Sequence, residues 1–87
     1  MSGEILLKIH NPSKKVLEKK VEKVSIPAYG GDLTVLTGRA PSEILLNEGK
    51  VKILNENAEV LGEYNIGTGI ADIAGNTCTI YTADFKK

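Results

Sequence analysis

Ala-Tyr-Gly-Gly-Asp-Leu-Thr-Val-Leu-Thr-Gly-Arg-Ala-Pro, residues 28–41, is the stretch that decides the fold. Gly30 and Gly31 can adopt positive φ angles without a steric penalty, and Gly38 can do the same at the far end. The chain is therefore able to reverse direction twice within about a dozen residues. We expect two tight turns around one very short strand.

The segment between these glycines has the period of a half-buried strand. Leu33 and Val35 point to one side, while Asp32 and the threonine after Leu33 point to the other. Tyr29, Asp32 and Arg39 then lie near the ends of a sheet, where binding residues usually occur. From residue chemistry alone, two interpretations of these three side chains stay equally open: they are polar residues of ordinary surface turns, or they bind a partner.

Length and composition predict one domain spanning residues 1–87, with 41% apolar residues to build a core. Eleven basic and eleven acidic side chains cancel, which removes the electrostatic reason to expect nucleic acid or an anionic membrane as a partner. No apolar run approaches the ~18 residues needed to span a bilayer. Any membrane association is expected to run through a partner.

Lysines crowd residues 14–23, where glutamates interleave with them. We interpret this cluster as a solvated face or strand edge that resists aggregation, and not as a binding patch. Its members are Lys14, Lys15, Lys19, Lys20 and Lys23.

Turn signals recur roughly every eight to twelve residues, which is typical of an antiparallel sandwich or barrel. The expected strands are residues 4–10, 42–46, 50–53, 60–66, 70–73 and 77–82, in addition to the short strand of the opening stretch.

Residues 13–25 fit two patterns. Leu17, Val21 and Val24 fall at helical spacing behind a possible Ser13 cap, which favours a helix. The competing interpretation is two short strands, residues 15–19 and 21–27, and it is stronger in the second half because Pro27 disfavours helix before it.

The cysteine and the histidine of the chain have no companions at metal-ligand spacing, so we predict no metal site. A catalytic pair of Cys78 and His10 is disfavoured because both fall inside expected strands; a buried thiol and a partly exposed imidazole are the simpler interpretation. A lone cysteine also predicts no internal disulfide and a cytoplasmic site. Convergence of Asp32, Asp72 and Asp84 stays open.

Residues 67–72, Gly-Thr-Gly-Ile-Ala-Asp, begin like a phosphate-binding loop. The third glycine is missing and no helical pattern follows, so we expect no cofactor here. A glycine-rich strand where two backbones approach closely is the better account.

Tyr29, Tyr64 and Tyr81 permit a second hypothesis, a small β-barrel that stacks single-stranded nucleic acid on aromatic side chains. Zero net charge and wide spacing of the three tyrosines count against it.

Several motifs in order resemble the ε subunit of F-type ATP synthase, in its N-terminal β-sandwich. They are Val21-Glu22-Lys23-Val24, Gly31-Asp32-Leu33, Gly38-Arg39-Ala40-Pro41, Gly49-Lys50-Val51 and the segment from Gly67 to Asn76, and the resemblance covers Leu6 to Asp84. It implies an all-β fold, a ten-stranded antiparallel β-sandwich of two sheets. It also implies two strands within residues 13–25, no catalytic residues and no cofactor.

The resemblance implies a rotor subunit that joins the γ subunit to the c-ring, so that ion-driven rotation reaches ATP synthesis. Tyr29, Gly30, Gly31 and Asp32 match the loop that reaches the c-ring, where Asp32 would face an arginine that c-subunit loops of the family often present. Arg39, Ser42 and Ile44 match the segment directed towards γ.

Thr37 and Arg39 depart from the family's Pro-Gly-His-Ala-Pro motif, because they replace its first proline and its histidine. Relatives commonly continue into an inhibitory C-terminal helical hairpin. This sequence ends where that hairpin would begin. If Lys87 is the natural end of the chain, we expect coupling without helix-extension inhibition, and if it is not, nothing follows about regulation. The expected location is the cytoplasmic face of the bacterial inner membrane, peripheral and through the complex.

Overall fold

The computed structural model describes residues 4–12, 15–36 and 40–86. Every regular element in these ranges is a β-strand, so the all-β prediction is confirmed. The strands are β1 (Ile5–His10), β2 (Lys15–Val21), β3 (Lys23–Ala28), β4 (Gly31–Val35), β5 (Ser42–Leu46), β6 (Gly49–Leu54), β7 (Val60–Ile66), β8 (Gly69–Ala74), β9 (Thr77–Thr82) and β10 (Phe85–Lys86).

Two strands, β2 and β3, occupy the segment whose pattern was ambiguous, as the resemblance implied. The helical alternative is therefore wrong for the described part of residues 13–25. Within β3, Val24 and Ile26 are both fully buried, and Pro27 follows them inside the strand. Tertiary burial of these branched side chains outweighs the weak helical preference of the lysines and glutamates.

Hydrogen bonding joins the strands in the order β10-β7-β6-β3-β5-β8-β9-β1-β2, with β4 paired to β3. This is one continuous sheet, not the two separate sheets expected, because the tip of β3 pairs with β5 through Ala28 and Leu46. The ladder between β1 and β9 is parallel, which also departs from a purely antiparallel sandwich. The remaining ladders of the described strands are antiparallel.

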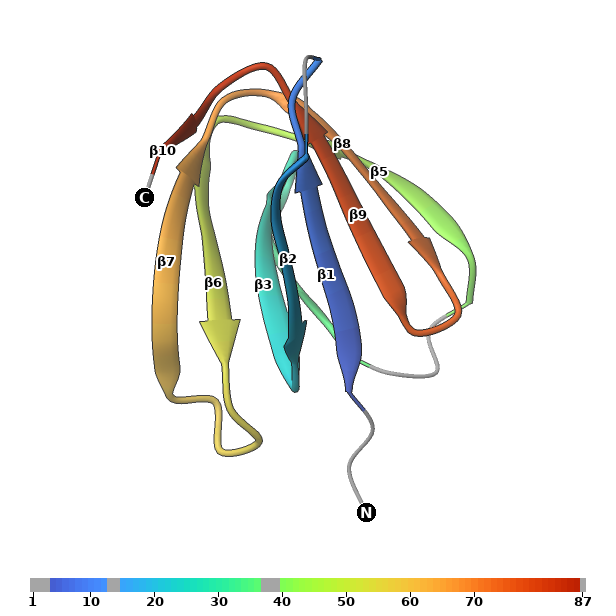
Figure 1. The fold of residues 1–87 in the computed structure, drawn as a ribbon, viewed down its shortest axis with the longest axis vertical. Helices are drawn as coiled ribbons and strands as arrows, with labels where there is room; N and C mark the ends of the chain where they lie inside the picture. The colour runs from blue at the N-terminus through green and yellow to red at the C-terminus, as the bar shows by residue number, and fades with distance from the viewer. Residues whose placement is uncertain (1–3, 13–14, 37–39, 87) are drawn as a thin grey trace.

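The single β3–β5 link divides the sheet into two arms, visible as the two sides of the ribbon in Figure 1. The first arm holds β10, β7, β6, β3 and β4, and the second holds β5, β8, β9, β1 and β2. Buried side chains from both arms form one cluster, so the arms pack face to face around a shared core. That cluster includes Leu7 of β1, Ile26 of β3, Val51 of β6, Ile73 of β8 and Ile80 of β9.

β2 ends the path of strands, so Lys15, Lys19 and Lys20 of the lysine cluster lie along a strand edge, whereas Lys23 lies on β3, paired with β6, and Lys14 falls outside the described residues. Lys19 is paired with Leu7, whose side chain is fully buried, so Lys19 lies on the core-side face of the edge strand while its own side chain is exposed. A lysine on an edge strand opposes pairing of that edge with another chain.

Candidate functional site

The turn between β3 and β4 consists of Tyr29 and Gly30, because Ala28 and Gly31 are the last paired residues of the hairpin. Gly30 has a φ of 111° and Gly31 a φ of 133°, as the opening stretch predicted. A Cβ atom at either glycine would meet no heavy atom within 4 Å. The backbone conformation, and not space, therefore requires glycine at these positions.

This turn is braced against the second arm. The backbone N–H of Tyr29 donates to the carbonyl oxygen of Leu45 at 3.2 Å, and the N–H of Asn47 donates to the carbonyl oxygen of Pro27 at 2.7 Å. Gly49 lies so close that a Cβ there would stand 2.8 Å from the Cβ of Pro27. A strand tip clamped in this way holds its turn in a fixed position relative to both arms.

Tyr29 and Asp32 are the exposed functional groups of the hairpin, and Tyr29 is 56% exposed. Leu33 is half-buried and Val35 is buried, whereas Thr34 is exposed, so the predicted alternation is confirmed. Within the described ranges, the carboxylate of Asp32 has no ion-pair partner. The hairpin thus exposes the ring of Tyr29 and the carboxylate of Asp32 to solvent, and hydrogen bonds to the second arm hold it in place.

The other predicted site residues lie elsewhere. Arg39, with Thr37 and Gly38, falls outside the described residues. Ser42 is half-buried and its Oγ donates to the carbonyl oxygen of Ala40 at 3.0 Å. Ile44 is half-buried and packs against the core.

The outward neighbours on β5 are Glu43 and Leu45, and Leu45 is 61% exposed. Sequence reasoning missed this face because three apolar residues in succession, residues 44–46, give no alternation from which to choose the buried side.

Cys78 and His10 do not form a catalytic pair, because they lie on opposite faces of the sheet. Cys78 faces the core, whereas His10 lies on the outer face with its ring 5.6 Å from that of Tyr81. Burial, followed by the charge of Asp72, raises the pKa of the Cys78 thiol from 9.0 to about 11, which keeps it protonated. A protonated, buried thiol is a poor nucleophile.

The three aspartates lie on different elements: Asp32 on β4, Asp72 on β8 and Asp84 after β9. No group of three or more metal-ligating side chains occurs among the residues described. Tyr64 stacks on Phe85 at 5.5 Å between ring centroids and is half-buried, so it is not on one exposed platform with Tyr29 and Tyr81.

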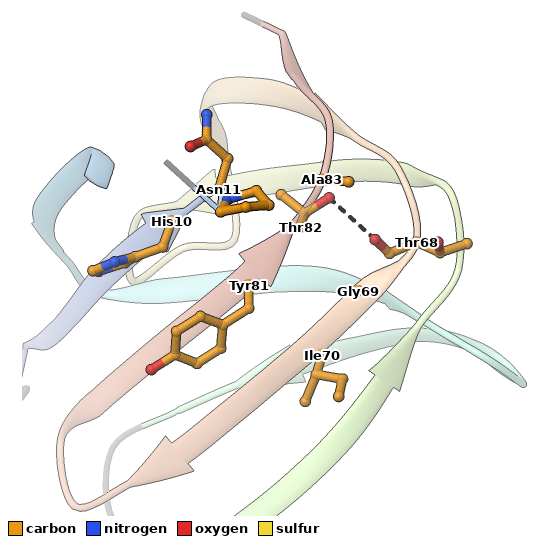
Figure 2. A pocket seen from close by; sticks show the side chains of 9 residues that line it. His10, Asn11, Thr68, Gly69, Ile70, Tyr81, Thr82 and Ala83 are labelled. Carbon is orange, nitrogen blue, oxygen red and sulfur yellow. Dashed lines mark hydrogen bonds between the residues drawn. The ribbon is translucent and has the colours of Figure 1, made fainter. Parts of the chain in front are cut away.

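Gly69, the second glycine of residues 67–72, lies where two backbones approach closely, as predicted, whereas Gly67 faces the side chain of Asp84. A Cβ atom at Gly69 would collide with the carbonyl oxygen of Tyr81 on the neighbouring strand. Beside it, the hydroxyl of Thr82 lies within 3.3 Å of the carbonyl oxygens of Gly67 and Thr68 and 3.0 Å from that of Asp84. Figure 2 shows Thr82 reaching towards Thr68.

An open groove of about 310 Å³ lies on the outer face of the second arm, next to this turn. Figure 2 shows Ile70 and Tyr81 side by side on β8 and β9, with His10 beyond them. A second depression, of about 420 Å³, lies between the β5–β6 and β7–β8 turns, and Glu48 and Asp84 are among the residues that line it. No helix of the described ranges is long and apolar enough to cross a membrane.

Comparison with known proteins gives a consistent result. The family described as "ATP synthase, Delta/Epsilon chain, beta-sandwich domain" matches residues 4–87. The ATP synthase epsilon chain of Granulibacter bethesdensis is 38% identical over 74 residues, which are 85% of this chain and 54% of the relative. That of Desulfatibacillum aliphaticivorans is 31% identical over 87 residues, which are 100% of this chain and 61% of the relative. This chain therefore spans little more than half the length of these relatives.

Solved structures agree on the fold. A chain of the Euglena gracilis mitochondrial ATP synthase (OSCP/F1/c-ring) matches with a TM-score of 0.81 and 21% identity, over 94% of this chain and 52% of that one. A chain of the Tetrahymena thermophila mitochondrial ATP synthase central stalk and c-ring matches with a TM-score of 0.73 and 21% identity, over 97% and 66%. The resemblance inferred from the sequence is confirmed.

Proposed function

This chain belongs to the ATP synthase delta/epsilon family, as its β-sandwich domain, and from that premise we propose that it is a non-catalytic subunit of the central rotor stalk. In this role it binds the γ subunit and the c-ring, and it couples ion-driven rotation to ATP synthesis. It reaches the membrane through the complex, peripherally and at the cytoplasmic face of the bacterial inner membrane.

The observation that carries the proposal is the braced β3–β4 turn in a chain of this family. Tyr29, Gly30, Gly31 and Asp32 form the c-ring contact. Hydrogen bonds to Leu45 and Pro27 hold the turn in place, and the carboxylate of Asp32 is left to meet a cationic partner. The contribution of such an ion pair ranges from nothing to several kcal/mol, depending on how completely water is excluded.

The γ contact in this proposal lies along the connection from β4 to β5 and the start of β5. It comprises Arg39, Ser42 and Ile44. Half-buried Ser42 and Ile44 support this contact mainly by fixing the backbone of β5, because only part of each side chain reaches the surface.

Co-purification of the chain with the γ subunit and the c-ring tests the proposal. Asp32→Lys should lower c-ring retention and leave the fold intact, since the side chain is exposed. Glu56→Lys is the matched control, because Glu56 is also exposed but lies near Lys23, at the opposite end of β3. Unchanged assembly and unchanged ATP-driven proton pumping in the Asp32 variant would exclude this loop as the contact, and failure of the unmodified chain to bind γ would exclude the function.

A further inference from the structure

Gly49, the first residue of β6, lies directly against Pro27 of β3. A Cβ atom at Gly49 would stand 2.8 Å from the Cβ and 3.4 Å from the Cγ of Pro27. The φ of Gly49 lies outside the left-handed region, so its backbone conformation is open to residues with a side chain. The reverse holds for Gly30 and Gly31, where conformation and not space requires glycine. At Gly49, the nearness of Pro27 requires it.

Pro27 stands where β3 changes its hydrogen-bonding partner. The ladder between β3 and β6 ends at the pair of Ser25 and Lys52. Two residues further along, Pro27 has no backbone N–H with which to continue a ladder. Its carbonyl oxygen accepts instead from the N–H of Asn47, in the turn between β5 and β6, at 2.7 Å. The β5–β6 turn and Gly49 therefore meet β3 at Pro27, along the edge opposite β4.

On the β4 side, Pro27 is paired with Asp32. Paired residues of neighbouring strands lie about 5 Å apart, so a displacement of Pro27 is passed to Asp32. Pro27 is buried, and its Cβ belongs to a ring closed on its own backbone nitrogen. Such an atom cannot rotate away from a close contact. An atom added at Gly49 is therefore accommodated by movement of the backbone.

The β3–β4 hairpin, and not β6, is the side that moves. Gly49 is paired with Ile66 of β7, whose side chain belongs to the shared core. Beyond Pro27 the hairpin ends in the exposed turn of Tyr29 and Gly30. A packed core resists displacement more strongly than an exposed turn does. The space left by Gly49 thus bears on where the end of the hairpin lies.

We propose that Gly49 is a positioning residue for the c-ring contact. The absence of a side chain at Gly49 lets Pro27 lie against the β5–β6 turn, and this contact sets the position from which Asp32 presents its carboxylate. The strength of an ion pair depends on the distance between its charges, so a shift of Asp32 weakens the contact. The inference deepens the proposed function and rests on it, because it requires the β3–β4 turn to bind the c-ring.

Binding of the full chain to the purified c-ring and, separately, to the purified γ subunit tests the inference. Gly49→Ala should weaken c-ring binding by about tenfold and leave γ binding within about twofold, because the start of β5 keeps its place. Gly62→Ala is the matched control in β7, where an added Cβ meets no heavy atom within 4 Å. It should leave both affinities within about twofold. Equal weakening of both by Gly49→Ala would indicate general damage and overturn the positioning role.

A double-mutant cycle with Asp32→Asn links Gly49 to the carboxylate. Asp32→Asn should weaken c-ring binding in the unmodified chain. It should have little further effect when combined with Gly49→Ala, because the carboxylate is then already displaced. A loss of stability alone would leave the two effects additive, and additive effects on c-ring binding would overturn the inference.

Pro27→Gly supplies the rescue, since it removes the ring carbons that the added Cβ would meet. The double variant Pro27→Gly/Gly49→Ala should bind the c-ring more tightly than either single variant. This comparison holds with Pro27→Gly even if Gly49→Ala alone does not fold, and a double variant that recovers no binding overturns the inference. If Gly49→Ala binds the c-ring as well as the unmodified chain, the inference falls and the proposed function stands. If the unmodified chain does not bind the c-ring, the proposed contact falls as well.

Discussion

The backbone N–H of Tyr29 and the carbonyl oxygen of Leu45 are joined by a hydrogen bond of 3.2 Å that connects the two arms of the sandwich. Tyr29 stands in the turn proposed to touch the c-ring, and Leu45 belongs to β5, the start of which is proposed to bind γ. One short link therefore fixes the position of the first contact relative to the second. In the proposed role, a rigid link keeps the angle between the two contacts fixed while the rotor turns.

Gly30→Ala should destabilise the protein by about 1–2 kcal/mol, because a side chain is strained at a φ of 111°. Urea unfolding measures the loss. Gly62→Ala is the control: its Cβ also meets no atom within 4 Å, and its φ lies outside the region that favours glycine. Equal stability of the two variants would show that the turn tolerates side chains.

Gly69→Ala should be more damaging, with a loss of about 3 kcal/mol or more, because the added carbon collides with the backbone of Tyr81. The backbone of a neighbouring strand cannot move aside as a flexible side chain does. Thermal unfolding followed by circular dichroism gives the comparison with Gly62→Ala. A melting temperature equal to that of the unmodified chain would contradict the close approach of β8 and β9.

Thr82→Val should cost about 1–2 kcal/mol, because it removes a buried hydroxyl that lies within hydrogen-bond distance of three carbonyl oxygens. Amide exchange should accelerate most in residues 67–69 and 84–86, which this hydroxyl ties together. Thr79→Val, on the outer face of the same strand, should change stability by no more than about 0.5 kcal/mol. Similar losses from both variants would refute this role for Thr82.

Stability should fall as pH rises from 9 to 11, because the pKa of Cys78 is raised from 9.0 to about 11 in the folded chain. In that window the unfolded chain has lost the thiol proton and the folded chain retains it, so folding is opposed by up to about 2–3 kcal/mol. Below pH 9 the effect is absent. Chemical unfolding at several pH values measures it, and Cys78→Val should remove this part of the slope; an identical slope in both proteins would contradict the assignment.

Lys19→Ile should promote self-association through β2, because it removes the charge from the core-side face of the edge strand. Sedimentation or light scattering at increasing concentration should show larger species. Lys20→Ile, with the same loss of charge on the outer face, should have a smaller effect, since Lys20 is paired with Leu6 and not with a core residue. Equal association of the two variants would remove the special role of Lys19.

Local chemistry made most strands and the chief turn readable in the sequence. Gly30 and Gly31 permit the backbone reversal that the structure shows, and Leu33 and Val35 alternate with polar residues. The glycine-rich segment at residues 67–72 predicted a close approach of two backbones, and the carbonyl oxygen of Tyr81 beside Gly69 confirms it. These features depend on interactions between near neighbours in the chain or on a single residue's φ, so periodicity and turn chemistry reveal them.

Periodicity and turn chemistry could not predict which strands pair over long distances in the sequence. The parallel ladder of β1 and β9 joins residues about seventy positions apart, and the division of β3 between β4, β6 and β5 follows no local pattern.

By itself, then, the sequence determined the all-β class and the Tyr29-Gly30 turn, because both follow from short-range stereochemistry. It also determined the family, because the order of the motifs identifies it. Only the tertiary structure decided that Leu45 and not Ile44 faces outward, in register with Ile70 and Tyr81. Three apolar residues in succession fit either face of a strand. The choice was made by pairing with β8, whose Ala71 and Ile73 are buried in the shared core.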